Sequence, residues 1–454
     1  MKPVIFREYD IRGVFNRDFD LAFAEELGQA YVTFALRAQK KTPLKVAIGH
    51  DARLSSPSIA QALVRGLTKS GANVVELGLI TSPISYFATF HIPDLSGAIM
   101  VTGSHNPPDY NGFKISVGNS TIFGAAIQQM REIVEAQDYV AGAGKSEKYD
   151  ILPAYLERYK QEFGQLDIGP VVIDCGNGAA GCILRKLYEA VGLKPIILFE
   201  EPDGTFPNHH PDPTVEENLD ALKKAVRDHR AAVGIGFDGD ADRIGVVDEN
   251  GRFLLGDELM TIISRDILSK TPGKTIIGDV KCSDRFFKDV ALAGGRAIMW
   301  KTGHSLIKQK VKEEKAPFGG ELSGHFFFAD RNYGYDDALY AGLRLIEILA
   351  KTRKSVSSLI GHLPAAYNTP EIRIDTTEEK KYLIVERLKT VFSDQRKGYR
   401  VDLTDGIRIS SQDGWALARA SNTQPVLVLR FEAQSEKSLN IMQSEFDEVI
   451  KPLL

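Results

Sequence analysis

The same order of strands and helices occurs three times along this chain, and this repeat limits the folds it can adopt. Each unit opens with a short apolar run that ends in a turn signal: Val46-Ala-Ile-Gly-His-Asp51, Val171-Val-Ile-Asp-Cys-Gly176 and Thr275-Ile-Ile-Gly-Asp-Val280. A helical stretch leads to a second strand introduced by glycine, at Gly71, Gly192 and Gly294. Another helical stretch leads to a third strand and a polar loop, from Gly97, Val233 and Ala316. This alternation predicts three related α/β units with mixed, largely parallel sheets.

The end of the chain has a different pattern. From Asn368 onward, short strands (PEIRID, GIRISS, WALARAS and VLVLRFEA) surround one helix, and a second helix follows them. This order predicts a smaller α+β domain. The small residues of Ala141–Ser146 mark a first boundary near residue 150, and further boundaries are expected near 255 and 367. The 454 residues are enough for three domains or four, and these boundaries divide them into four: 1–150, 151–255, 256–367 and 368–454.

Charge and cysteine content disfavour several classes of protein. With 56 basic and 60 acidic residues, no overall field would attract nucleic acid or an anionic membrane. The three cysteines, Cys175, Cys182 and Cys282, have the spacing of neither a disulfide framework nor a zinc site. No apolar stretch approaches the length of a membrane span, and the N-terminal segment soon becomes charged. We expect a cytoplasmic monomer or weak oligomer, with neither a nucleic-acid nor a membrane partner.

The loop after the third strand of the first unit, Thr102–Pro108 (TGSHNPP), is the first candidate site. Glycine lets the backbone approach a ligand closely, and the two prolines stiffen the exit. This composition also suits a purely structural turn. In a functional interpretation, Ser104 can carry a phosphoryl ester, with His105 beside it and Lys114 as a downstream cation.

The corresponding loop of the second unit is acidic: Asp238-Gly-Asp-Ala-Asp-Arg243. In an extended segment, alternate residues share one side, so the carboxylates of Asp238, Asp240 and Asp242 would converge. Oxygen ligands separated by small residues suit Mg²⁺. A calcium loop of the EF-hand type is disfavoured, because Arg243 stands where that loop needs glycine. A solvated acidic turn is the structural alternative, although the preceding strand is apolar.

The third unit ends its third strand in Gly319-Gly-Glu-Leu-Ser-Gly-His325. Glu321 and Ser323 offer an acceptor and a donor two residues apart, which suits sugar hydroxyls, and His325 could move a proton. An ordinary polar turn is the alternative interpretation here. For Lys281, for His304 and for the N-terminal segment Tyr9–Arg12, each considered alone, a solvated surface position is the simpler interpretation.

In the last domain, the segment Arg419-Ala-Ser-Asn-Thr-Gln-Pro425 joins two strands. Arg419 can bind a phosphate through two parallel hydrogen bonds, and Ser421, Asn422 and Thr423 add hydroxyl, amide and backbone donors. The segment therefore has the composition of an anion-binding loop.

Two other motifs suggest different functions. The segment Gly176–Gly181 matches GxGxxG after a strand, with Glu200 and Glu201 where a dinucleotide-binding acid is expected. The match is short and leaves the serine and aspartate loops without a role, so we favour a tight structural turn. The adjacent His209 and His210 lie between prolines and their side chains should diverge, so we assign them to structure as well.

Taken in order, the serine loop, DGDADR, GELSGH and RASNTQP resemble the α-D-phosphohexomutase family over nearly the whole chain. The resemblance implies four domains around a central cleft, three with a related α/β fold and a smaller fourth one. It also implies reversible conversion of hexose 1-phosphate and hexose 6-phosphate, of mannose and glucose, through a phosphoserine enzyme. A hexose 1,6-bisphosphate would be both the intermediate and an activator. The implied cofactor is Mg²⁺, and the implied partners are small-molecule phosphosugars.

The resemblance also assigns roles to residues. It implies Ser104 as the phosphorylated residue, which together with Asp238, Asp240 and Asp242 would bind the metal. Lys114 and His325 are the acid/base candidates, and Arg12 and Arg243 are further catalytic candidates. Substrate-binding positions would be Tyr9, Lys281, His304, Glu321, Ser323, Arg419, Ser421, Asn422 and Thr423.

Three positions depart from the common family pattern: Gly103 stands where alanine is common, Ala241 where glycine is common and Leu322 where methionine is common. We expect Gly103 to loosen the serine loop and Ala241 to narrow the backbone freedom of the aspartate loop. Two alternative functions stay open. They are phosphoglucosamine mutase, with the same chemistry on a 2-amino sugar, and a phosphosugar-binding protein without turnover.

Overall fold

The computed structural model describes residues 2–39, 42–393, 398–422 and 424–454. The chain forms two compact units, which are described separately. The first consists of residues 1–259, 323–328 and 335–359, and the second of residues 260–322, 329–334 and 360–454. The chain passes between the units within α8 (Gly256–Lys270), again at residues 322/323, 328/329 and 334/335, and at the end of α12 (Val356–Ile360).

The first unit begins with a seven-stranded mixed sheet. Along its main path the strands are β1 (Ile11–Val14), β5 (Tyr110–Val117), β4 (Gly97–Val101), β2 (Lys45–His50), β3 (Asn73–Leu79) and β7 (Ser146–Lys148), and β6 (Ser120–Thr121) pairs with β5. Strand β2 is parallel to both β3 and β4, whereas β5 is antiparallel to β4 and β1. The helices are α1 (Leu21–Gln39), α2 (Ser56–Lys69), α3 (Ser82–His91) and α4 (Ala125–Ala136), with a short 3-10 helix at Pro3–Ile5.

Apolar side chains of α1, α2 and α4 form one continuous core against this sheet. Phe23, Leu27, Leu63 and Ile127 are 2% exposed or less within it. Helix α1 packs closely on α2 because Gly28 and Gly66 bring the two backbones together. A Cβ atom at Gly66 would lie 1.9 Å from the Glu25 carbonyl oxygen. This packing fixes the sheet whose carboxyl edge carries the serine loop.

A second sheet of the first unit has the order β12 (Phe253–Leu254), β11 (Ile244–Val247), β10 (Val233–Phe237), β8 (Val171–Asp174) and β9 (Ile196–Leu198). Strand β8 is parallel to β9 and β10, and the hairpin β10–β11 is antiparallel. The helices of this part are α5 (Leu152–Phe163), α6 (Leu184–Ala190), α7 (Asp220–His229) and α11 (Ala338–Thr352), with 3-10 helices at Ala179–Cys182 and Glu216–Leu219. The strand β16 (Phe326–Phe328) also belongs to this unit.

The second unit contains a parallel arrangement in which β13 (Thr275–Asp279) lies between β14 (Arg296–Trp300) and β15 (Phe318–Gly320). Its helices are α9 (Asp284–Leu292) and α10 (His304–Glu314). In all three repeats, the first strand therefore lies between the second and the third and is parallel to both. The predicted repeat of largely parallel α/β units is confirmed, and antiparallel strands at the edges of the first two sheets make them mixed.

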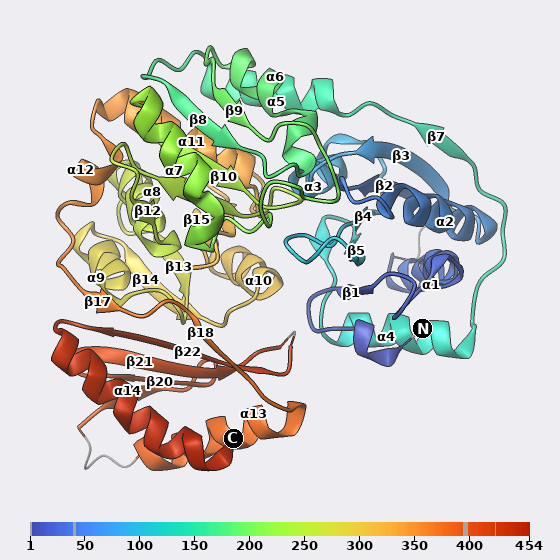
Figure 1. Cartoon of the computed structure of the whole chain (residues 1–454). Helices are drawn as coiled ribbons and strands as arrows, with labels where there is room; N and C mark the ends of the chain where they lie inside the picture. The colour runs from blue at the N-terminus through green and yellow to red at the C-terminus, as the bar shows by residue number, and fades with distance from the viewer. Residues whose placement is uncertain (1, 40–41, 394–397, 423) are drawn as a thin grey trace. The chain divides into compact units, whose positions relative to one another are not determined.

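The end of the chain forms a six-stranded antiparallel sheet. Its strands are β17 (Tyr367–Asn368), β18 (Ile372–Asp375), β19 (Arg400–Asp402), β20 (Ile407–Ser410), β21 (Gly414–Ala420) and β22 (Val426–Ala433). Helices α13 (Glu378–Phe392) and α14 (Glu436–Ile450) cover one face (Figure 1), and a 3-10 helix follows at Lys451–Leu453. The predicted smaller α+β arrangement is confirmed.

Two further observations concern the whole of the described chain. No disulfide joins the three cysteines. Among the described helices, none combines the length and the apolar composition needed to cross a bilayer.

Candidate functional site

The serine loop follows β4 and holds Ser104 in a buried, left-handed backbone conformation. Ser104 is 2% exposed and has a φ of 50°. Its backbone N–H donates to the Thr102 hydroxyl at 2.8 Å, and its own hydroxyl donates to Asp238 Oδ2 at 2.8 Å. The hydroxyl also lies 3.2 Å from His105 Nδ1. The loop therefore places the serine oxygen directly against the aspartate loop.

The three aspartates converge as predicted, but the reason differs from the sequence argument. Asp238, Asp240 and Asp242 are fully buried, and one oxygen of each lies within 4.8 Å of the others. The segment is not extended: it is the turn of the β10–β11 hairpin, in which Ala241 N donates to the Asp238 carbonyl. Asp238 Oδ1 accepts from the backbone N–H groups of Asp242 and Arg243. Convergence thus comes from a turn closed by backbone hydrogen bonds.

Lys114, from β5, compensates the charge of this cluster. Its Nζ donates to Asp240 Oδ2 at 2.6 Å and also to Asp242 Oδ2. Ser82, at the start of α3, donates its hydroxyl to Asp240 Oδ2 at 2.5 Å. Burial by itself lowers the pKa of Lys114, but the carboxylates of Asp240 and Asp242 outweigh it and raise that pKa well above its ordinary value. Lys114 is therefore held as an ammonium ion.

The same cluster shifts the pKa values of two of its carboxyl groups in opposite directions. Burial and the charges of Asp240 and Asp242 raise the pKa of Asp238 well above its ordinary value. Burial also disfavours ionised Asp240, but Lys114 and the Ser82 hydroxyl hold the pKa of Asp240 below its usual range. One lysine leaves excess negative charge among three buried carboxyl groups, so the loop favours a further cation.

The oxygen atoms of the aspartate loop fit a hard cation. Among the described residues, no hydrogen-bond donor reaches Oδ1 of Asp240 or Oδ1 of Asp242, although both atoms are buried. Buried carboxylate oxygens without donors are costly unless an ion or water satisfies them. All the candidate ligands offer oxygen, which matches the preference of Mg²⁺.

Ala241 occupies a backbone conformation that favours glycine. Its φ is 60° and its side chain is fully buried. We expect Ala241→Gly to exceed Ala180→Gly in unfolding free energy by about 1–2 kcal/mol, because only position 241 is relieved of left-handed strain. Ala180 is also buried but is not among the residues with positive φ. Urea unfolding of the two variants measures the difference, and equal stabilities would contradict this account.

His325 reaches the aspartate loop because its segment is bound to the β10–β11 hairpin. Ile244 N donates to the Gly324 carbonyl at 3.2 Å. Arg243 Nε donates to His325 Nε2 at 2.9 Å, so Nε2 is the acceptor and Nδ1 carries the proton. Nδ1 lies 3.5 Å from Asp336 Oδ2 and 3.7 Å from Asp242 Oδ1. The ring is therefore oriented by charged groups on both sides.

Arg12, from β1, approaches the serine loop from its other end. Its Nη1 donates to Asn106 Oδ1 at 2.6 Å and to the Gly103 carbonyl at 3.3 Å, and its Nη2 pairs with Asp10 at 2.5 Å. Tyr9 is buried in the turn just before this strand. All five predicted catalytic residues lie in the first unit: Ser104, Lys114, Arg243, His325 and Arg12. Two predicted substrate-binding residues, Tyr9 and Ser323, lie there as well.

The remaining predicted substrate-binding residues lie in the second unit. Lys281 is 6% exposed, and its Nζ pairs with Glu371 at 3.1 Å and lies 4.0 Å from Asp279. Although burial lowers the pKa of Lys281, these two carboxylates raise it above its ordinary value. The charge of Lys281 is thus neutralised by an acid that sequence reasoning did not identify.

Glu371 gives the second unit a pH-dependent element. The ammonium of Lys281 lowers the pKa of Glu371 to about 2. This stabilisation is present above the unfolded pKa near 4.5 and is lost as the pH falls toward 2. We expect Glu371→Gln to lower the unfolding free energy by about 1–2 kcal/mol at pH 7, a difference that shrinks below pH 4.5. Unfolding curves at pH 7 and pH 3.5 test this, and a difference that grows in acid would contradict it.

Glu321 and His304 are brought together at the carboxyl end of the parallel strands. Glu321 Oε1 accepts from Gly303 N at 2.5 Å, and His304 is the first residue of α10. Asp405, from the loop before β20, accepts from Thr302 N at 3.0 Å and from Arg419 Nε at 2.9 Å. A single aspartate therefore ties the loop before His304 to the predicted phosphate-binding arginine.

Ser421 and Asn422 follow Arg419 at the end of β21. Ser421 N donates to the Val426 carbonyl at 2.9 Å, and the Ser421 carbonyl accepts from Lys381 Nζ at 2.6 Å. The predicted residue Thr423 lies outside the described residues. The loop is thus closed by its own strand ends and by a buried lysine of α13.

The GxGxxG segment packs as a tight turn. A Cβ atom at Gly181 would lie 1.8 Å from the Glu200 carbonyl oxygen, which leaves no room for a pyrophosphate there. Glu200 is paired with Arg185, and His209 with Asp174 at 3.1 Å. These contacts support the structural interpretation of both motifs.

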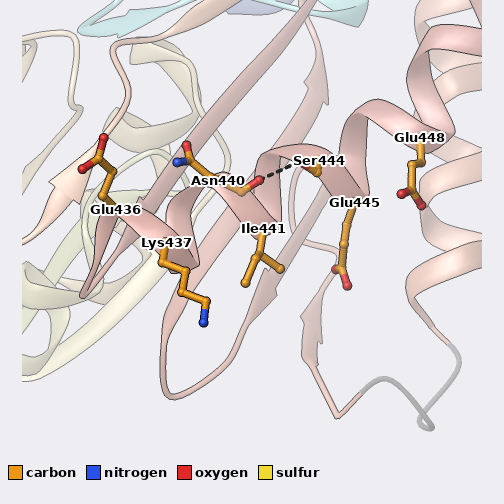
Figure 2. Close-up of a pocket in the computed structure, with 7 residues that line it drawn as sticks. All are labelled: Glu436, Lys437, Asn440, Ile441, Ser444, Glu445 and Glu448. Carbon is orange, nitrogen blue, oxygen red and sulfur yellow. Dashed lines mark hydrogen bonds between the residues drawn. The ribbon is translucent and has the colours of Figure 1, made fainter.

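A depression over α14 does not provide a second candidate. It is lined by residues of this one helix, namely Glu436, Lys437, Asn440, Ile441, Ser444, Glu445 and Glu448. Figure 2 shows these side chains spread along the helix, with the hydrogen bond from Ser444 Oγ to the Asn440 carbonyl. Polar groups that do not converge on a point offer no binding site.

Comparison with known proteins shows which family of enzymes this chain resembles. Four family models match in order. They are Phosphoglucomutase/phosphomannomutase, alpha/beta/alpha domain I at residues 3–140, domain II at 153–251, domain III at 255–367 and the C-terminal domain at 371–449.

Curated relatives match over nearly their full length. A phosphomannomutase/phosphoglucomutase of Pseudomonas aeruginosa is 43% identical over 448 residues, which cover 98% of this chain and 95% of the relative. A phosphoglucomutase of Neisseria gonorrhoeae is 40% identical, with coverage of 98% and 96%. The crystal structure of a phosphoglucomutase/phosphomannomutase family protein from Burkholderia thailandensis matches with a TM-score of 0.92 at 39% identity, covering 100% and 98% of the two chains. The chain therefore belongs to the phosphoglucomutase/phosphomannomutase family.

Proposed function

We propose that the protein is a phosphomannomutase/phosphoglucomutase that interconverts the 1-phosphates and 6-phosphates of mannose and glucose through phosphorylated Ser104. The observation that carries the proposal is the hydrogen bond from the Ser104 hydroxyl to Asp238, within a buried cluster that Lys114 compensates. A buried serine among three carboxylates is suited to carrying a phosphoryl group in the presence of a divalent cation.

In the proposed reaction, phosphorylated Ser104 transfers its phosphoryl group to the free hydroxyl of the bound hexose phosphate. The P–O bond to Ser104 breaks, a P–O bond to the sugar oxygen forms, and the hydroxyl proton passes to a base. The resulting hexose 1,6-bisphosphate reorients and returns its other phosphoryl group to Ser104. The P–O bond to that second sugar oxygen breaks, and the base returns its proton to this oxygen, which becomes a hydroxyl. The cycle balances without an external phosphate donor, because the serine ends as it began.

Residues of the first unit would supply charge compensation and proton transfer. Lys114 is held as an ammonium ion, and Arg243 has its guanidinium beside His325. Cations close to the transferred group offset the repulsion between two anions and stabilise charge in the transition state. His325 accepts at Nε2 and carries a proton at Nδ1, so it is our candidate for proton transfer.

Asp238, Asp240, Asp242 and phosphorylated Ser104 would hold Mg²⁺, which supplies electrostatic stabilisation of the phosphoryl oxygens when bound. We propose that Glu321 and Ser323 bind sugar hydroxyls. Arg419, Ser421, Asn422 and Thr423 would bind the phosphate that is not being transferred. We also propose substrate-binding roles for Tyr9, Arg12, Lys281 and His304. Because glucose and mannose differ only at C2, a pair that binds other hydroxyls accepts both sugars.

Phosphorus NMR of the purified protein tests this function. Separate samples contain Mg²⁺, a trace of glucose 1,6-bisphosphate and one of three substrates: glucose 1-phosphate, mannose 1-phosphate or glucosamine 1-phosphate. We expect the first two to be converted to their 6-phosphates. Preference for the amino sugar would instead identify a phosphoglucosamine mutase. No conversion in any sample would indicate a phosphosugar-binding protein and overturn the proposal.

Further parts of the proposal follow from the same chemistry. We propose that hexose 1,6-bisphosphate activates the enzyme by restoring phosphorylated Ser104. We also propose that the protein acts in the cytoplasm as a monomer or weak oligomer, with no nucleic-acid or membrane partner.

A further inference from the structure

A buried arginine lies beneath the serine loop. Arg53 follows β2, and its side chain is 0% exposed. All five of its guanidinium N–H groups have an acceptor. Nε donates to Asp51 Oδ2 at 3.2 Å, and the four terminal N–H groups donate to backbone carbonyl oxygens of the segment that contains Ser104.

These four carbonyl groups are spread along the segment from Ser104 to Tyr110. Nη2 donates to the carbonyls of Ser104 at 2.7 Å and Asn106 at 2.5 Å. Nη1 donates to those of Tyr110 at 3.0 Å and Pro107. Because the guanidinium is planar and its donors are fixed in direction, it sets the positions of four peptide groups at once.

Asp51 accepts a hydrogen bond from a backbone N–H group of the same loop. Its Oδ2 accepts from Gly103 N at 3.2 Å as well as from Arg53 Nε, and its Oδ1 accepts from the Ser56 hydroxyl at 2.5 Å. The pair of Asp51 and Arg53 therefore binds both N–H and carbonyl groups around Ser104.

The close approach of Arg53 depends on the lack of a side chain at Gly103. A Cβ atom there would lie 2.5 Å from Arg53 Cζ. Gly103 is not among the glycines with positive φ, so its conformational freedom is not what the loop uses. The expectation that Gly103 loosens the loop is not supported: the glycine makes room for the group that binds the loop.

The other side of Arg53 is covered by the second α/β part of the same unit. The guanidinium lies over the Phe206 ring at 5.2 Å, and a Cβ atom at Gly204 would lie 2.4 Å from Arg53 Cα. A Cβ atom at Gly239, between the aspartates, would lie 2.5 Å from the Ser104 carbonyl oxygen. The Ser104 peptide is thus enclosed between Arg53 and the aspartate loop.

We propose that Arg53 is a positioning residue for phosphoryl transfer. By binding the carbonyls of the serine loop it holds Ser104 in its left-handed conformation and keeps the hydroxyl oxygen at Asp238. The inference rests on the proposed function. Its physical basis is that a displacement of about 1 Å at a reacting atom costs on the order of 100-fold in rate.

The test compares Arg53→Lys with Arg344→Lys. Lysine keeps the charge but offers three donors from one atom, so it cannot bind four diverging carbonyls. Arg344 is a matched control, because it is 1% exposed and lies over the Phe328 ring at 5.1 Å, in α11. Three quantities are measured: kcat and KM for glucose 1-phosphate, the rate of Ser104 phosphorylation by glucose 1,6-bisphosphate, and amide hydrogen exchange of residues 103–110.

We expect Arg53→Lys to lower kcat and the phosphorylation rate together, about 10- to 100-fold. KM should stay within about threefold, and exchange should accelerate in residues 103–110. Arg344→Lys should change neither rate by more than about threefold. A variant Arg53→Lys with wild-type kcat, or with reduced kcat but unchanged exchange in this segment, would overturn the inference.

A second variant covers the case in which Arg53→Lys does not fold. Phe206→Leu keeps the guanidinium and removes the ring beneath it, and we expect it to lower kcat about three- to tenfold, with faster exchange in residues 103–110. Unchanged kcat and exchange in this variant would count against the inference. If the wild-type protein shows no turnover, the proposed function fails, and the exchange measurements alone decide whether Arg53 holds the loop.

Discussion

Replacement of Ser104 with alanine should abolish mutase turnover while the protein remains folded. The side chain is small and buried, and alanine removes only the hydroxyl that bonds to Asp238. Loss of a nucleophile that carries the transferred group typically costs 10³-fold or more, so we expect kcat to fall by at least about 10³-fold. The coupled conversion of glucose 1-phosphate measures this loss, and circular dichroism establishes that folding is retained.

Ser82→Ala is a matched control for this variant. Ser82 is also buried and also donates its hydroxyl to an aspartate of the same loop, but to Asp240. We expect it to keep measurable turnover and to accept phosphate from glucose 1,6-bisphosphate, as intact-mass measurement would show. Substantial activity in Ser104→Ala, or phosphate incorporation at another residue, would contradict the phosphoserine role of Ser104.

The second large effect is expected for Asp240→Asn. Asparagine keeps the shape of the side chain but removes the charge of a group that pairs with Lys114. That group also has a buried oxygen, Oδ1, which no donor among the described residues reaches. We expect the Mg²⁺ concentration for half-maximal activity to rise by at least about 100-fold, or activity to be lost, because a metal ligand has lost its charge. A Mg²⁺ titration of turnover measures this change.

Asp248→Asn controls for the removal of a buried aspartate elsewhere. Asp248 is 1% exposed in the same unit and accepts backbone hydrogen bonds from Asn250 and Arg252 in a turn. It should leave the Mg²⁺ requirement within about twofold of the wild-type value. If Asp240→Asn and Asp248→Asn have the same Mg²⁺ requirement, Asp240 does not belong to the ligand set.

Local patterns in the sequence were sufficient to predict the fold class. Short, mainly apolar runs, such as Val171–Asp174, form buried strands. Because each repeat has the same order of elements, each adopts the same strand order, with the first strand in the middle. The α+β character of the end of the chain was recognisable from its short strands, whereas their antiparallel pairing is seen only in the structure.

The sequence was less reliable about how the aspartates converge. Alternation in an extended strand suggested one face, whereas the carboxylates meet in the turn of a hairpin, with Ala241 at positive φ. Residue types at fixed spacing identified the cluster correctly. The backbone path was not evident, because one residue in a left-handed conformation changes the direction of the side chains that follow.

The sequence by itself determined the repeat, the fold class and the candidate residues of the serine and aspartate loops. Only the tertiary structure decided which charges face one another. Lys114 meets Asp240 across 126 positions in the chain, and Arg53 binds the Ser104 carbonyl across 51. In the second unit, Asp405 joins Thr302 to Arg419. The physical reason is that strand and turn preferences act over a few residues, whereas the partner of a buried charge is set by which strand ends the packed sheets bring together.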